Sequence, residues 1–550
     1  MNIIGIKKMI NLRLNHYSFI IFFIILSIMP QCIYSQDKSN IITGSDSGTR
    51  DFRTPSIDYS DYLCGQMSKD VNFRISKMKI VRTKIVDKGN VLFNIIPIDQ
   101  FGNFIQNLTN KELEFDAILE KDYVKYKSML KFQSESKLEK SKKTNLHILV
   151  ENSILTTNLQ DILRQIRNLI PKLMPTDSIS VSLFNQKIQN ILPIESAQAA
   201  YLKLSVENVK CSGTNSAINV LYQKLNELET HKSDANNIIV QIYTGYENSS
   251  FIDTYGDIID RAKDLNIPIY TVGIGTKVRS FQTQPLSEAT GARYYDLQEE
   301  NLENLSAILN EIYYSDKVFY QYKLTPDAFS EEWDNLVMQA ALYNGADFLD
   351  NFVDIYFKAP DIMTTNKILA IYDKEESFPD TNSFESYQMI ALYMQNNPTI
   401  KMEITGYTDN ESKTTELALS RADKVRDAIV SFGVNPRRFV LKSAGDEEPI
   451  YTSSAPQNLL ALNRRTELKW LREEDKPAEI KGELAESEFM ADQFVITWEK
   501  IGYKAYYKRT VINGETMYKV ILWNYETNEQ AAEEINRLKA TFQDIEFKVE

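Results

Sequence analysis

The chain of 550 residues is poor in the side chains from which catalytic and metal sites are usually built, with three histidines and three cysteines. His147 lies in an apolar run and His231 among polar residues, so neither is placed as a catalytic base. The sequence shows no His/Cys metal spacing, no phosphate-binding glycine loop and no nucleophile–base–acid set. We therefore expect a protein that is not an enzyme and that uses no cofactor.

Positive charge is also in short supply. The chain has 62 basic and 75 acidic side chains, a net charge of −13. Without residues 1–35, whose charges are Lys7, Lys8 and Arg13, the balance is 59 against 75, or −16. Binding to a phosphate backbone needs a basic footprint, so nucleic acid is excluded as the main partner. The length predicts several domains.

Long apolar runs are confined to the amino terminus. The basic residues there precede Phe19–Met29, which is too short to span a membrane comfortably. This pattern predicts a signal peptide over residues 1–35, with cleavage after Ser35. Two alternatives stay open: a lipid anchor on Cys32, although the residues before it are larger than such a site prefers, and a retained amino-terminal anchor.

Residues 36–65 contain Ser, Asp, Gly and Thr with little periodicity, which predicts a flexible lead-in. Cys64 and Cys211 remain after cleavage. An oxidising compartment would permit a bond between them, and two separate thiols are the alternative.

Strand patterns flank a central region on both sides. Val91–Ile96 is a buried-strand run within residues 66–142, for which we expect a β-sandwich. Tyr320–Leu324 and Phe352–Phe357 look like strands within residues 317–363. This second segment either completes the sandwich or connects to the next domain.

Residues 143–316 alternate buried strands with helices, which predicts a doubly wound parallel sheet with ligands at the carboxyl ends of its strands. The expected strands are Leu146–Val150, Ile179–Phe184, Ile238–Tyr243 and Pro268–Gly273.

Five segments of this region carry a family resemblance: Leu149–Ser153, Ser212–Ala217, Tyr243–Gly245, Ile269–Gly275 and Leu286–Gly291. They resemble the corresponding segments of von Willebrand factor A domains. The resemblance implies a module used for protein contacts, and in that family a divalent cation is held by D-x-S-x-S, a threonine and the aspartate of T-D-G.

Three of these cation-binding positions keep an oxygen donor, and we interpret them as vestigial: Glu151, Ser153 and Thr214. The other two are Leu155 and Gly245, which offer no side-chain oxygen. Since Mg²⁺ requires a near-octahedral shell of oxygens, we expect the metal site to be lost.

A second set of motifs lies downstream. Ile404–Asp409 places a carboxylate after a strand, Leu419–Ala422 places a guanidinium on the next helix, and Asn463–Arg465 adds a basic pair. Such groups suit a ligand that carries both an amine and a carboxylate. With the β-α-β-α-β pattern of residues 364–472, the motifs resemble the OmpA-like peptidoglycan-binding domain.

That resemblance implies a binding site for the diaminopimelate of the wall peptide. Asp409 would hold the ammonium group and Arg421 the carboxylate. The pocket would be completed by Thr408, Leu417, Asn463 and Arg464. The loop after Asp409 is shorter than in the family, which leaves open whether diaminopimelate still binds.

Residues 473–486 are expected to be a charged linker, and residues 487–550 a small α+β domain. Its segments Tyr518–Tyr525 and Arg537–Lys539 resemble a SPOR domain with a ferredoxin-like fold, which implies binding to glycan strands. Trp523 and Tyr525, within the first segment, are candidate glycan contacts, and the alternative is that they are ordinary core or surface aromatics.

The sequence thus predicts a multidomain α/β and α+β protein that acts as a non-catalytic scaffold. It would reside in the periplasm, bind peptidoglycan and present the A-type domain to an envelope protein partner, with association to the outer membrane open. The alternative is a surface adhesin that uses a metal ion. The partner and the oligomeric state stay undetermined.

Overall fold

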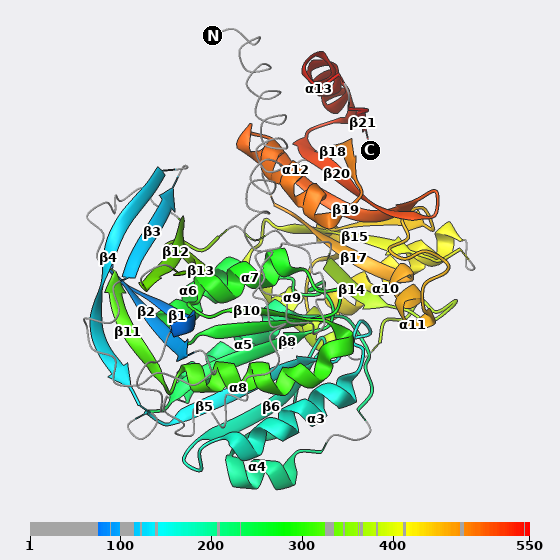
Figure 1. The fold of residues 1–550 in the computed structure, drawn as a ribbon. Coiled ribbons are helices and arrows are strands. Elements are labelled where there is room, and N and C mark those ends of the chain that lie inside the picture. Colours follow the sequence, from blue (N-terminus) through cyan, green and yellow to red (C-terminus); the bar gives the residue numbers. More distant parts are fainter. Residues whose placement is uncertain are drawn as a thin grey trace.

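The computed structural model shows a seven-stranded sheet, a parallel-sheet domain, a βαβαβ domain and a carboxyl-terminal unit (Figure 1). The expected signal peptide, the lead-in, Cys32 and Cys64 lie outside the described part of the chain. No helix in that part is both long and apolar enough to cross a membrane. The described residues are 75–87, 90–99, 115–121, 124–137, 141–205, 209–231, 233–324, 335–344, 347–360, 362, 367–380, 383–410, 414–472, 478–543 and 545–549.

Strands from before and after the parallel-sheet domain build the seven-stranded sheet, in the order β1-β2-β11-β4-β3-β12-β13. The end strands β1 and β13 contact each other, so the sheet curls into a sandwich. Its strands are β1 (Ile75–Asp87), β2 (Asn90–Asp99), β3 (Phe115–Lys121), β4 (Val124–Ser136), β11 (Phe319–Leu324), β12 (Asn335–Asn344) and β13 (Asp347–Tyr356).

The expected sandwich over residues 66–142 is therefore incomplete by itself. Residues 317–363 supply three of its strands and are not a mere connection. β11 lies between β2 and β4, so the parallel-sheet domain is inserted into the sandwich between β4 and β11.

The inserted domain has the predicted doubly wound sheet, in the order β10-β9-β8-β5-β6-β7, with β7 as an antiparallel edge. Apolar clusters on both sides of the sheet hold the helices, because strands such as β5 are buried along their whole length. The strands are β5 (Thr144–Glu151), β6 (Ser178–Phe184), β7 (Ile188–Ser196), β8 (Asn236–Tyr243), β9 (Ile269–Ile274) and β10 (Tyr294–Leu297). The helices are α3 (Leu159–Leu169), α4 (Ala197–Lys203), α5 (Ala217–Thr230), α6 (Tyr255–Asp264), α7 (Ser280–Ala289) and α8 (Leu305–Ser315).

His147 on β5 makes the stability of this domain pH-dependent. Burial, followed by the charge of Lys224, lowers the pKa of His147 to about 4 from an ordinary value of 6.5. As the pH falls, His147 is protonated in the unfolded chain before it is protonated in the folded domain. The unfolding free energy is therefore highest above pH 6.5 and declines as the pH falls towards 4. We expect a loss of about 2 kcal/mol in unfolding free energy between pH 7.5 and pH 5.

Denaturant titrations at the two pH values measure this loss. His147→Gln removes the titrating group, so the unfolding free energy of this variant should lose about 2 kcal/mol less between pH 7.5 and pH 5. His231→Gln, at an exposed position, should keep the full pH dependence. An equal pH dependence in both variants would contradict the assignment to His147.

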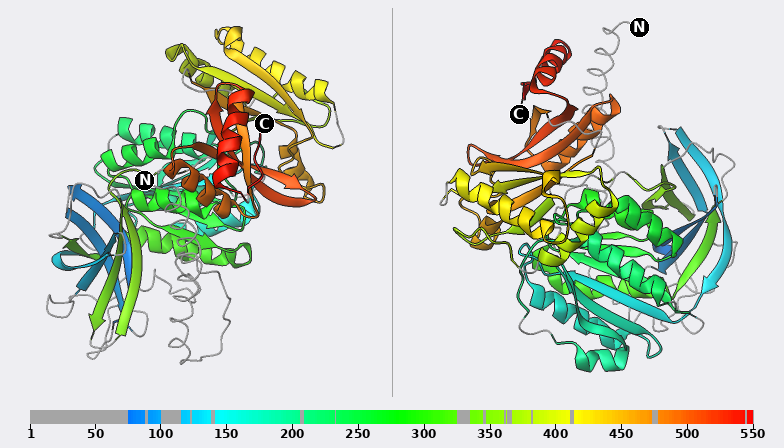
Figure 2. Two further views of the ribbon diagram at one scale, coloured as in Figure 1. Left: turned by 90° about the horizontal axis from the view of Figure 1, so that it is seen from above. Right: turned by 180° about the vertical axis from the view of Figure 1, so that it is seen from behind.

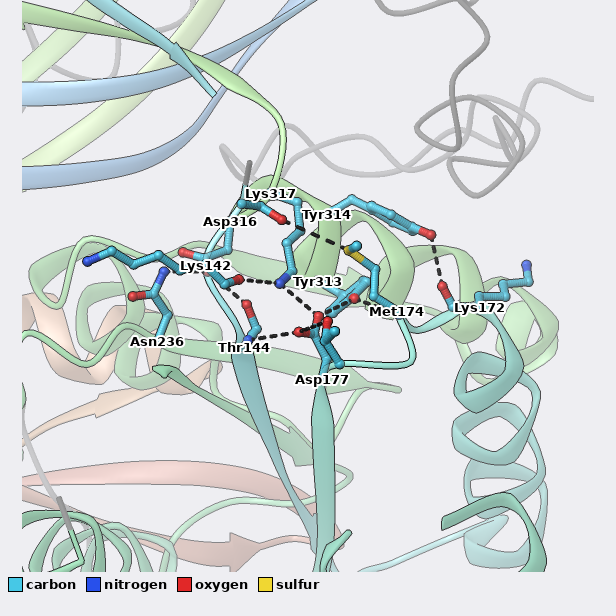
Figure 3. Close-up of polar contacts among 12 residues, drawn as sticks. Lys142, Thr144, Lys172, Met174, Asp177, Asn236, Tyr313, Tyr314, Asp316 and Lys317 are labelled. Atoms are coloured by element: carbon cyan, nitrogen blue, oxygen red, sulfur yellow. Dashed lines mark hydrogen bonds and ion pairs between the residues drawn. The ribbon is translucent and has the colours of Figure 1, made fainter. Parts of the chain in front are cut away.

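A buried polar cluster holds the two chain crossings between the sandwich and the inserted domain (Figure 3). Lys317, just before β11, pairs with Asp177 at 2.7 Å, and both side chains are about 1% exposed. Lys317 also donates to the carbonyl of Lys142, while Asp177 accepts from the Thr144 amide and the Tyr313 hydroxyl. The entering and leaving strands are thereby fixed to one another.

The βαβαβ domain has the order β14-β17-β15-β16, with its two long helices sharing one apolar core with the sheet. The predicted element order is confirmed. The elements are β14 (Lys367–Ile371), α9 (Phe384–Asn396), β15 (Lys401–Tyr407), α10 (Thr415–Val430), β16 (Phe439–Gly445), α11 (Gln457–Leu460) and β17 (Arg465–Leu471).

The carboxyl-terminal unit has a ferredoxin-like βαββαβ order, with the antiparallel sheet β19-β20-β18-β21. It begins earlier than predicted, because part of the expected linker 473–486 forms a central strand. Alternation of buried Ala478 and Ile480 with glutamate and lysine hid this strand among charged neighbours. The elements are β18 (Ala478–Ala485), α12 (Glu488–Lys500), β19 (Lys504–Ile512), β20 (Glu515–Tyr525), α13 (Asn528–Thr541) and β21 (Lys548–Val549).

Candidate functional site

Asp409 lies just beyond β15 and is almost buried, at 9% exposure. Arg464 donates from Nη1 to the Asp409 carboxylate at 2.7 Å and from Nε to the carbonyl of Tyr372. The structure therefore brings together two predicted site residues that are far apart in the sequence.

Arg421 projects from α10 and is fully buried. Its guanidinium donates to three main-chain carbonyls, those of Glu376 at 2.7 Å, Tyr407 at 2.8 Å and Asp373 at 3.2 Å. Burial is the largest cause that lowers the pKa of Arg421, to about 10, so the side chain stays charged at neutral pH. A carboxylate ligand at Arg421 would compete with these main-chain bonds.

Close packing of α10 on β15 sets this geometry. A Cβ atom at Gly406 would lie 1.8 Å from the carbonyl oxygen of Ala418, so only glycine permits the approach. Thr414 caps α10 by accepting from the Leu417 amide, and Leu417 is half-buried on the first turn. Thr408 is buried, and its hydroxyl has no hydrogen-bond partner among the described residues.

Asn463 has a structural position. Its Oδ1 accepts from the amides of Ile450 and Tyr451, and its Nδ2 donates to the Tyr451 carbonyl. The next residue but one, Arg465, pairs with Glu467 at 2.6 Å. The run Asn463–Arg465 therefore connects the start of β17 with residues 450–451, with Tyr372 after β14 and with Asp409 after β15.

The loop end of the parallel sheet contains the vestigial cation positions. Glu151 is fully buried and accepts from Ser153 Oγ and from the amides of Thr244 and Gly245. Burial raises its pKa, and the hydrogen bond from Ser153 is the largest opposing effect. The hydroxyl of Thr214 is buried without a partner in the described structure.

Leu155 fills the space that a further cation ligand would need. A Cβ atom at Gly245 would lie 2.5 Å from the Cβ of Leu155, so an acidic side chain cannot be placed there without displacing it. Both carboxylate oxygens of Glu151 are already hydrogen-bonded. These residues do not fit a divalent cation.

The same loop end packs against the βαβαβ domain. Leu155 is fully buried in an apolar cluster that we call the docking cluster. Its other buried members are Tyr246 of the parallel-sheet domain and Ile368, Ile450, Tyr451, Leu459 and Leu462 of the βαβαβ domain.

Polar contacts surround the docking cluster. The Ile368 amide donates to the carbonyl of Asn248 at 2.7 Å, and Ser249 donates back to the Ile368 carbonyl at 2.8 Å. Lys367 forms an ion pair with Glu247. Figures 1 and 2 place the βαβαβ domain at this end of the inserted domain and the seven-stranded sheet on the other side. Sequence reasoning missed this interface because Leu155 carries no pattern beyond a lost ligand.

A cleft of about 1060 Å³ separates the open face of the βαβαβ sheet from the sheet of the carboxyl-terminal unit. Trp523, Trp470 and Tyr506 line it, together with lysines and glutamates from both sheets. Lys504 lies 4.6 Å from the centre of the Trp523 ring. Tyr525 packs against the core of its own unit, so the two candidate glycan contacts are in different environments.

Two family models match this chain. Residues 145–311 match the von Willebrand factor type A domain, and residues 380–459 match the OmpA family. Outer membrane porin F of Pseudomonas fluorescens is 29% identical over 99 residues, which is 18% of this chain. The chain spans about 30% of the length of this curated relative.

Solved structures match parts of this chain. The peptidoglycan-associated lipoprotein of Burkholderia pseudomallei is 27% identical over 19% of this chain and 91% of its own, with a TM-score of 0.18. The carboxyl-terminal domain of Helicobacter pylori MotB is 23% identical over 20% and 86%, with a TM-score of 0.18. BatB of Bacteroides thetaiotaomicron is 13% identical over 31% and 98%, with a TM-score of 0.26. The two domain assignments rest on the family models.

Proposed function

From a chain that contains a von Willebrand factor type A domain and an OmpA family domain, we propose a non-catalytic scaffold of the bacterial cell envelope that binds peptidoglycan. The observation that carries the proposal is the arrangement of Asp409, Arg464 and Arg421 at the end of β15 in the OmpA family domain. Similarity to an outer membrane porin over 99 residues supports an envelope location.

A carboxylate beside two guanidinium groups suits the zwitterionic end of diaminopimelate. Asp409 would accept the ammonium group, and the positive charges would attract the carboxylate. Arg464 keeps one nitrogen, Nη2, without a hydrogen-bond partner among the described residues, whereas Arg421 uses all three nitrogens on main-chain carbonyls. We therefore assign the carboxylate contact to Arg464 and a positioning role to Arg421.

Asp409→Asn tests this function. The amide keeps the size of the side chain and can still accept from Arg464, but it loses the charge that holds the ammonium group. We expect affinity for purified peptidoglycan to fall at least about tenfold, because a charge-assisted hydrogen bond contributes more than about 1.5 kcal/mol. Co-sedimentation measures the bound fraction.

The matched control is Asp427→Asn, on an exposed part of α10. It should sediment like the unmodified protein. If Asp409→Asn binds peptidoglycan as well as the unmodified protein does, Asp409 does not recognise diaminopimelate.

The carboxyl-terminal unit supports a second wall contact in this proposal. Trp523 faces the cleft between the two sheets, where an aromatic ring can stack on a sugar. Two weak contacts on one chain strengthen each other through effective concentration. A protein partner of the A domain would use its sides, since its loop end already contacts the OmpA family domain.

A further inference from the structure

The outer face of the seven-stranded sheet carries a concentration of positive charge. Register places Arg82, Asn94, Gln321 and Ser134 in one row across β1, β2, β11 and β4. The next row contains Lys84, Leu92, Lys323 and Lys131. Arg82 and Lys84 lie on the same face of β1, and Lys323 and Lys131 lie further across that face, on β11 and β4. This is unexpected in a chain with a net charge of −13.

These cations oppose one another in the structure. Lys323 and Lys131 face each other directly across β11 and β4, and directly opposed like charges destabilise a sheet. Partial burial, followed by the charge of Arg82, lowers the pKa of Lys84. An anion beside Lys84 would relieve the second of these repulsions.

A hollow of about 540 Å³ lies between this face and the edge of the inserted domain. Two of its charges are compensated, since Arg82 pairs with Asp316 at 3.0 Å and Lys137 with Glu135 at 3.3 Å. The remaining lining cations are Lys84 and Lys142, which have no ion-pair partner among the described residues.

The buried cluster at the chain crossings fixes one wall of the hollow. Asp316 accepts from Thr144 and Asn236, and the Lys142 carbonyl accepts from Lys317. The Lys142 side chain points away from that cluster (Figure 3). The hollow therefore exists because the sandwich and the inserted domain are held together.

We propose that this hollow binds a phosphate monoester carried on a hydroxyl-rich molecule, such as a phosphorylated sugar. Lys84 and Lys142 supply the charge for the phosphate group, while Arg82 stays paired with Asp316. Asn94, Gln321 and the serines of β4 supply hydrogen-bonding groups for hydroxyls. The volume is within the range of small-molecule sites.

Calorimetric titration of the full chain at low ionic strength tests the site, with glucose 6-phosphate, glucose and inorganic phosphate as probes. We expect saturable binding of glucose 6-phosphate, weaker binding of phosphate and none of glucose. Lys84→Gln combined with Lys142→Gln should weaken glucose 6-phosphate at least about tenfold. Lys401→Gln combined with Lys500→Gln, at exposed positions in other domains, should leave it unchanged.

Three outcomes would overturn the site. They are no saturable binding, equal binding by the Lys84/Lys142 variant, and equal weakening by the control variant, which would indicate general charge attraction. A further arm uses vesicles that contain phosphatidylglycerol. Binding to vesicles without binding of glucose 6-phosphate would assign the charge to lipid headgroups and reject the sugar phosphate.

Discussion

Leu155→Asp is expected to separate the OmpA family domain from the A domain. The substitution places a carboxylate in a fully buried apolar cluster and next to the buried carboxyl group of Glu151. Removing a buried leucine costs about 2–5 kcal/mol, and burying an uncompensated charge adds several more. Because separation of the domains lets water reach the new carboxylate on the side of the docking cluster, the open arrangement should be favoured.

Small-angle scattering should show a larger radius of gyration, and hydrogen exchange should rise in residues 450–462. Leu202→Asp, at a position 82% exposed on the same domain, is the matched control and should behave like the unmodified protein. Ile450→Asp approaches the cluster from the other side and should give the same separation. If both cluster variants keep the closed shape, the docking cluster does not hold the domains.

Arg421→Ala is expected to destabilise the OmpA family domain by about 3 kcal/mol, since it removes the donor to the buried carbonyl of Tyr407 and to the partly buried carbonyls of Glu376 and Asp373. Denaturant unfolding measures the loss. Arg437→Ala, on an exposed turn of the same domain, should cost less than about 0.5 kcal/mol. A stable Arg421→Ala protein that has lost peptidoglycan binding would instead make Arg421 a ligand contact.

This difference affects how wall-binding variants are interpreted. A double substitution of Asp409 and Arg421 would combine lost recognition with lost stability. Asp409→Asn alone keeps the fold-determining guanidinium in place. The two substitutions therefore have to be measured separately.

Several parts of the fold could be predicted because their pattern is local. Parallel strands buried on both faces, such as β5 and β8, are continuous apolar runs, and they were located correctly. The strand β18 was missed because its glutamate and lysine residues resemble a linker, although Glu479 is buried. The partnership of β11 with β2 and β4 joins segments on both sides of an inserted domain, which no local pattern reveals.

The candidate site was predictable to the same extent. Its motifs placed Asp409 and Arg464 in one region, and the structure joins them at 2.7 Å. The main-chain carbonyls of Asp373 and Glu376 accept hydrogen bonds from Arg421. This turn has no sequence signal, because any residue can supply a carbonyl. Leu155 could be recognised as a missing donor, but its role in docking depends on a domain more than 200 residues away.

The position of β11 also determines the order in which this protein can fold. Until residue 324 has been made, β1 with β2 and β3 with β4 are two hairpins whose facing edges have nothing to pair with. The inserted domain is synthesised before β11 and has an apolar core of its own. It can therefore fold while the two hairpins are still without β11. Open edges of this kind favour pairing with other chains, which makes the interval before β11 arrives the stage most exposed to aggregation.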